Sequence, residues 1–246
     1  MEMKKIFAII MLFVTLVTLS SCNYVNDILY LFATPEQKLE MAFEKLSETS
    51  YTMEGSMRID MTLSYLGESQ KQTFVIDMLT EANPNEIYTE EVMNGETQRS
   101  YTKINDDEVS IYTEENGKWT EEVQSLEKYK EENGNGFLDI DVKDVFTLED
   151  GIWVGNVEVI SEMLEETTNK LSEDLVGEGA TLESFELEKY NIEMGKNDIS
   201  KVDIVMSVVM KIQGVKVTMK MSVPLTISKV GQTEVTVPAG IKATSK

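Results

Sequence analysis

Tyr51 to Tyr65 read YTMEGSMRIDMTLSY, a stretch in which apolar and polar residues alternate. The odd-numbered positions carry tyrosine, methionine, glycine, isoleucine or leucine, and the even-numbered positions carry charged or hydroxyl side chains. Successive side chains of a β-strand point to opposite faces of its sheet. The stretch therefore predicts one long strand with an apolar face and a polar face.

The same alternation recurs on both sides of short turn sequences. Ile204 to Ile227 alternate around Gln213-Gly214, and two shorter apolar runs flank Asn94-Gly95. Asn-Gly is the strongest short signal for a two-residue hairpin turn. These segments predict antiparallel hairpins, and similar hairpins follow one another along most of the chain.

Two segments have the helical period instead. Thr34-Pro35-Glu36-Gln37 has the residues of a capping box and predicts a helix that ends near Ser47. A second helix is predicted from Val157 to Val176. Because both helices have apolar stripes to bury, we expect an α+β fold. It would be a curved antiparallel sheet, or half-barrel, with helices packed on its concave side. Residues 34–246 would form one domain.

The N-terminal region has the organisation of a secretion signal. Lys4 and Lys5 precede a 14-residue segment, Ile6 to Leu19, that is apolar except for two threonines and too short to span a bilayer. Leu19-Ser20-Ser21-Cys22 follows and resembles the lipobox of bacterial lipoproteins. That resemblance implies a signal peptide at residues 1–21, lipidation of Cys22, and a lipidated tether at residues 22–33. It also implies a protein anchored to the extracytoplasmic face of the cell membrane.

The order of segments resembles the LolA/LppX-like group of bacterial envelope proteins. The resemblance is carried by the lipobox, by a helix at Pro35–Leu46 that runs into the strand from Tyr51, and by meandering hairpins. The turn Asp150-Gly151-Ile152-Trp153, the mid-chain helix and the closing Val237-Pro238-Ala239 also fit. It implies an incomplete β-barrel with helices across its opening, enclosing an apolar cavity. Better-known members carry lipoproteins or lipids between membranes, but the strong negative charge of this chain departs from the pattern.

Composition argues against several classes of function. The chain has no histidine and a single cysteine, which removes the Ser-His-Asp arrangement and the usual zinc ligands. We therefore expect neither an enzyme nor a protein with a cofactor or metal. The formal net charge of −22 disfavours binding to nucleic acid. Between Glu81 and Asp150 there are 20 acidic and 6 basic residues, which predicts an acidic surface suited to a basic partner in the cell envelope.

Methionine is the most informative residue type. Twelve of the 15 methionines follow Cys22, and seven of them fall on predicted apolar strand faces. Methionine is flexible and polarizable, so it suits both a cavity for varied apolar ligands and ordinary core filling. We expect an apolar ligand, such as a lipid or an acyl chain, to bind between sheet and helices. The alternative is a structural or interaction protein with a filled core. The candidate ligand-binding residues are Met53, Met57, Met61, Met206, Met210, Met219 and Met221.

Overall fold

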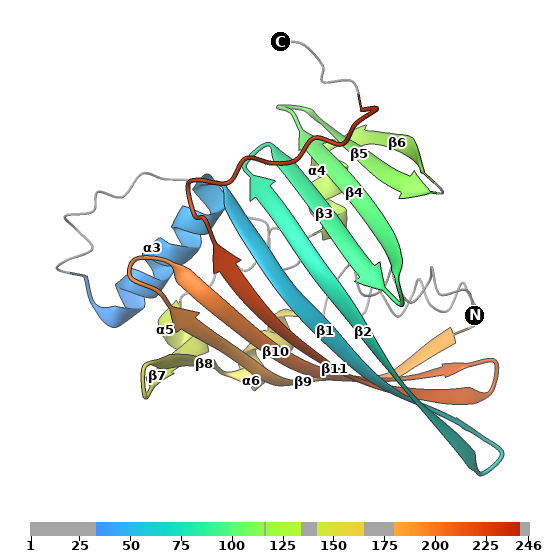
Figure 1. The fold of residues 1–246 in the computed structure, drawn as a ribbon. Coiled ribbons are helices and arrows are strands. Elements are labelled where there is room, and N and C mark those ends of the chain that lie inside the picture. Colours follow the sequence, from blue (N-terminus) through green and yellow to red (C-terminus); the bar gives the residue numbers. More distant parts are fainter. Residues whose placement is uncertain (1–32, 116, 134–141, 165–179, 242–246) are drawn as a thin grey trace.

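The computed structural model describes residues 33–115, 117–133, 142–164 and 180–241. One antiparallel sheet of eleven strands runs through these residues and twists strongly along its length (Figure 1). The spatial order is β6-β5-β4-β3-β2-β1-β11-β10-β9-β8-β7, so the first strand pairs with the last. The strands are β1 Tyr51–Tyr65, β2 Glu68–Asn83, β3 Glu86–Met93, β4 Glu96–Ile104, β5 Glu108–Glu115, β6 Lys118–Ser125, β7 Phe146–Glu149, β8 Ile152–Gly155, β9 Ala180–Met194, β10 Ile199–Ile212 and β11 Val215–Ser228.

Two-residue turns join many neighbouring strands. Asn94 and Gly95 have φ of 53° and 82°, and Gln213 and Gly214 have φ of 50° and 87°. Two consecutive positive φ values are the signature of the type I′ turn, whose twist matches that of the strands it joins. Both predicted hairpins are confirmed, since β3 pairs with β4 and β10 pairs with β11 in antiparallel register.

The described helices are short. The longest, α3, begins as predicted, because the Thr34 side chain accepts from the Gln37 N–H and the Gln37 side chain accepts from the Thr34 N–H. None of the described helices is long and apolar enough to cross a membrane. The helices are α3 Pro35–Glu48, α4 Leu126–Asn133, α5 Val142–Val145 and α6 Val157–Met163.

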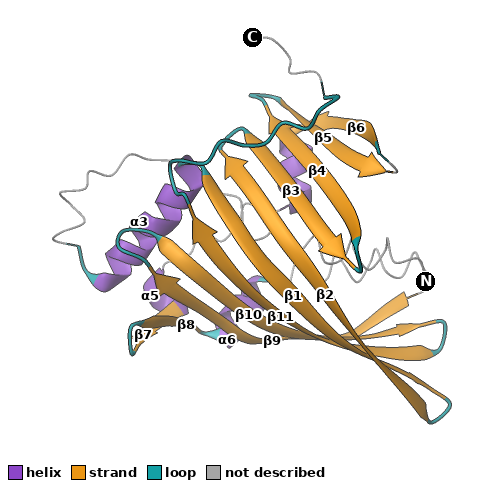
Figure 2. Cartoon of the chain, viewed as in Figure 1, coloured by secondary structure: helices purple, strands orange, loops and turns teal. Residues whose placement is uncertain are grey.

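The expected α+β fold class is wrong, because strands make up most of the molecule and helices are few (Figure 2). A half-barrel with a helical layer on its concave side is therefore not the description that the structure supports. Three segments account for the difference. The polar run Glu121 to Glu132 predicts a helical connection, but its first residues belong to strand β6, Lys118–Ser125. The strand predicted over Phe185 to Met194 begins earlier, at Ala180, and the described part of the mid-chain helix is only Val157–Met163. The rest of that predicted helix lies outside the described residues.

The two faces of the sheet differ as the alternation predicts. On β1 the odd-numbered side chains are mostly buried, whereas Glu54, Ser56, Arg58 and Asp60 are exposed on the opposite face. The buried face belongs to one hydrophobic core, which also contains Leu39 of α3, Val145 of α5 and Ile160 of α6. We call the buried side the methionine face, after the residues described below, and the opposite side the outer face.

The segment after β11 runs across the outer face. It passes over the ends of β1 to β4 (Figure 1). The Thr233 hydroxyl lies 2.8 Å from the Thr52 hydroxyl, and the Thr236 N–H donates to the Glu81 carboxylate at 2.8 Å. These contacts fix the C-terminal segment to β1 and β2, on the side of the sheet away from the methionine face.

Candidate functional site

All seven methionines predicted from the sequence lie buried on one face of three adjacent strands. Their side chains are between 2% and 6% exposed. Three come from β1, two from β10 and two from β11, and these strands are neighbours in the order β1-β11-β10. The seven residues are Met53, Met57, Met61, Met206, Met210, Met219 and Met221.

Strand register brings several of these methionines directly opposite one another. Met61 pairs with Met219 across β1 and β11, and Met206 pairs with Met221 across β10 and β11. Directly opposed residues have Cβ atoms about 4.5–5.5 Å apart, so their side chains are in contact range. The methionine face is therefore a continuous thioether-rich surface across the centre of the sheet.

Aromatic residues link α3 to the part of the sheet beside the methionines. The rings of Phe43 on α3 and Phe146 on β7 lie 6.2 Å apart, and those of Phe146 and Tyr190 on β9 lie 5.7 Å apart. Such distances are typical of favourable aromatic pairs. These contacts fix α3 beside β7 and β9 within the same core.

Three further residues of the methionine face were not among the predicted ligand-binding residues, although the alternation in β2 already predicts Met78 on its apolar side. Met78 on β2 and Met93 on β3 are buried in the same core. Glu91 on β3 is only 1% exposed, and neither of its carboxylate oxygens has a hydrogen-bond partner. The signal was present in the alternation, because Ile87, Glu91 and Met93 share the odd-numbered side of one strand.

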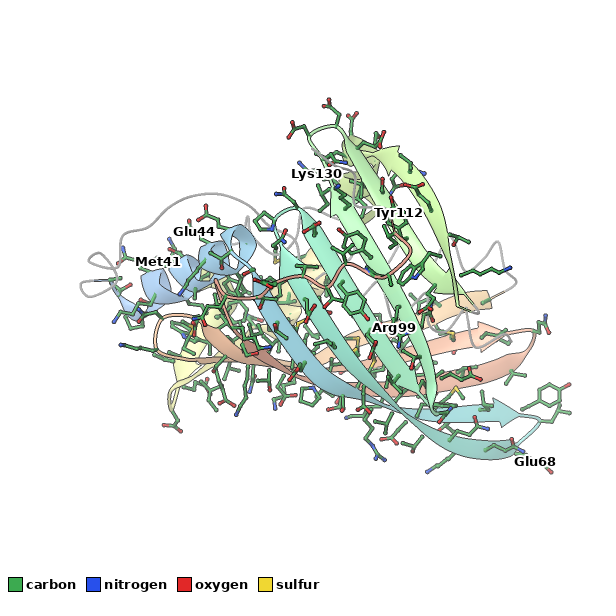
Figure 3. The ribbon with its side chains drawn as sticks, turned by 45° about the horizontal axis from the view of Figure 1, so that its top comes forward. Met41, Glu44, Glu68, Arg99, Tyr112 and Lys130 are labelled. Carbon is green, nitrogen blue, oxygen red and sulfur yellow. The ribbon has the colours of Figure 1, made fainter. Side chains whose placement is uncertain are left out.

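The outer face of β3 to β6 has a different character. Arg99 on β4 donates from Nε to Glu90 at 2.6 Å and from its NH1 nitrogen to Glu114 at 2.9 Å. Tyr112 on β5 donates to Glu121 at 2.6 Å. Arg99 and Tyr112 lie on neighbouring strands in Figure 3. Carboxylates on this face are therefore bound by tyrosine hydroxyls and by an arginine.

These contacts set the protonation of the outer face. The hydrogen bond from Arg99 is the largest cause that lowers the pKa of Glu90. Burial, followed by the hydrogen bond to Glu90, raises the pKa of Tyr88 to about 12. At neutral pH the carboxylate is charged and the tyrosine is protonated, as their hydrogen bond requires.

The described side chains of the methionine face are mostly apolar. Thioethers and aliphatic groups offer apolar contact, and Glu91 offers a single acidic group. Within the described ranges, no group of three or more histidine, cysteine, aspartate or glutamate residues is arranged to hold a metal ion. Cys22, the predicted lipidation site, lies outside the described residues.

Comparison with known proteins gives no family. No family model matches the chain, and no curated protein matches it significantly. The YwiB protein of Bacillus subtilis matches with a TM-score of 0.24 and 9% identity, over 71% of this chain and 91% of that one. The attachment invasion locus protein Ail of Yersinia pestis, in complex with the heparin analogue sucrose octasulfate, matches with a TM-score of 0.23 and 6% identity, over 72% and 99%. Likenesses this low carry no argument about fold or function.

Proposed function

We propose that this protein is a non-catalytic lipoprotein on the extracytoplasmic face of the cell membrane, and that it binds a lipid or an acyl chain at its methionine face. The observation that carries the proposal is the gathering of the seven predicted methionines, with Met78 and Met93, on one buried face. Thioether side chains change conformation at little cost, so a surface made of them can fit apolar chains of different shape.

The N-terminal segment supports the proposed location. Leu19-Ser20-Ser21-Cys22 resembles a lipobox, and a lipid-anchored protein works beside a source of apolar ligands. The resemblance to the LolA/LppX-like group supports the same function, since members of that group carry lipids or lipoproteins. A single acyl chain gives only marginal membrane binding, so stable anchoring at Cys22 requires two or three chains.

The alternative is an interaction protein with a filled core. The methionines would be equally buried if they simply filled a close-packed core. In that case the acidic outer face of β3 to β6 would bind a basic partner of the cell envelope. Its carboxylates include Glu90, Glu114 and Glu121, each of which already accepts a hydrogen bond within the chain.

A titration with an uncharged, pyrene-labelled hydrocarbon separates the two functions. If the methionine face binds ligand, the probe binds with saturation, and Met57→Ala and Met219→Ala change its affinity. The matched control is Leu39→Ala, a buried residue of α3 on the same core, which should change stability more than probe affinity. An unsaturable signal that is the same in all four proteins would refute the ligand-binding function.

A further inference from the structure

Glu91 lies on the methionine face between one apolar and one polar cross-strand neighbour. Its Cα partners are Met78 on β2 and Gln98 on β4. Met78 in turn pairs with Gly55 of β1, next to the strands that carry the methionines. Glu91 is therefore on the strand next to β2 and two strands from β1, and its carboxylate belongs to the same buried face.

The carboxylate has no partner in the described structure. Both oxygens lack a hydrogen bond although the residue is 1% exposed, and Gln98 donates nothing to them. A buried charge without a partner is costly, because the solvation it loses is not replaced. Burial raises the pKa of Glu91 to about 7, so a large share of the carboxyl groups is ionised at neutral pH.

The charged residues nearby do not compensate for this cost. The residues directly opposite are uncharged, and Glu90 points to the outer face, where Arg99 binds it. On β4 the nearest charged residue on the same face as Gln98 is Glu96, which is exposed and also acidic. Within the described residues, no donor bonds to the Glu91 carboxylate, and burial is the one cause that shifts its pKa.

We infer that Glu91 pairs with a protonated amine on the ligand, and that the ligand class is an amine-bearing amphiphile whose chain lies on the methionine face. This inference rests on the proposed ligand-binding function. An ammonium group supplies both the opposite charge and up to three hydrogen-bond donors. A free fatty acid would instead bring a second carboxylate against the first, so the site discriminates against it.

Three probes with the same chain test the inference: dodecylamine, dodecanol and dodecanoic acid. They are offered together, at equal concentration, to the full chain in a non-ionic detergent, and bound probe is measured by native mass spectrometry. Charge-assisted hydrogen bonds are roughly twice as strong as neutral ones. We expect the amine to be bound about tenfold or more in preference to the acid, and in clear preference to the alcohol.

Variants assign that preference to one carboxylate. Glu91→Gln and Glu91→Met should keep binding of the chain but lose the preference for the amine. Glu90→Gln changes the neighbouring carboxylate on the other face, and it should leave the preference intact. Equal binding of amine and alcohol, stronger binding of the acid, or an unchanged preference in Glu91→Gln would overturn the inference. Binding of none of the probes by any protein would instead overturn the proposed function itself.

Discussion

Glu90 and Glu91 are adjacent in the chain and lie in opposite environments. Glu90 accepts hydrogen bonds from Arg99 and Tyr88 on the outer face, whereas Glu91 is buried on the methionine face with no partner. Neighbouring side chains of a strand point to opposite faces, so the two glutamates cannot act as an acid–base pair. The same geometry makes each of them a control for the other.

Stability should depend on pH through Glu91. A carboxyl whose pKa is about 7 in the folded chain, against an ordinary 4.5, binds more protons when folded. The free energy of unfolding therefore falls between about pH 4.5 and pH 7, by about 3 kcal/mol from this group. Glu91→Gln removes this loss. In urea unfolding, the free energy of unfolding of the variant relative to that of the parent should therefore increase as pH rises through that window.

Glu90→Gln is the control for this prediction, and its effect on the pH dependence of stability should have the opposite sign. Arg99 lowers the pKa of Glu90, so Glu90 contributes stability above its ordinary pKa and loses it as pH falls. Glu90→Gln should therefore have a lower free energy of unfolding than the parent above pH 5. Parallel stability curves for Glu91→Gln and the parent between pH 5 and 8 would show that Glu91 is not held as the structure has it.

Substitution of methionine face residues by alanine tests whether the face is a filled core. A fully packed methionine replaced by alanine costs about 2–5 kcal/mol, because the void stays empty. At a ligand-binding face the loss without ligand should be clearly smaller at Met57, Met206 and Met219, while the affinity for an apolar probe changes. Denaturant unfolding of the three variants, with Leu39→Ala as a packed reference, measures the difference. Full losses at all three sites with no probe binding in the parent would favour the interaction protein.

Gly55 should not tolerate a side chain. A Cβ atom there would lie 2.3 Å from the backbone oxygen of Pro224 and 2.9 Å from the Leu225 side chain. The backbone oxygen can move only if β11 shifts, so Gly55→Ala should lower the free energy of unfolding by about 1–3 kcal/mol. Glu54→Ala, at the exposed neighbouring position, should change it by no more than about 0.5 kcal/mol. Equal stability of the two variants would show that β1 and β11 are not packed this closely.

Cys22 should be the acylation site that anchors the protein to the membrane. Cys22→Ser removes the thiol that a lipobox requires, so the variant should be uncleaved or released from the membrane. Partition between detergent and aqueous phases measures this, and Ser20→Ala, which keeps a small residue near the cysteine, should still partition into detergent. Undiminished partition of Cys22→Ser after removal of the signal segment would contradict the assignment of a lipobox.

The parts of the fold that were predicted correctly are those fixed by local sequence. Alternation in Tyr51–Tyr65 and the turn at Asn94-Gly95 act over a few residues, and both appear in the structure. The fold class was wrong partly because the polar run from Glu121 predicts a helical connection, whereas its first residues extend β6 to Ser125. They form a strand because pairing with β5 satisfies their backbone, and that pairing is not visible in their own sequence.

In the candidate site, too, some residues could be predicted from local sequence and others could not. The burial of the seven methionines on one face could be predicted, because apolar residues at every second position of a strand share a face. Glu91 was missed because acidic residues are seldom fully buried, and only its parity with Ile87 and Met93 marked it. Its burial depends on strands β2 and β4, which pair with β3 only in the folded sheet.

Mass spectrometry of the protein purified from cells shows whether the methionine face holds an apolar ligand. The full chain is purified without added lipid and its mass is measured twice, under native and under denaturing conditions. Acyl groups on Cys22 are covalent and contribute to both masses, whereas a ligand of the methionine face contributes only to the native one. We expect the native mass to exceed the denatured mass by one lipid-sized molecule, and two equal masses would contradict ligand binding at the methionine face.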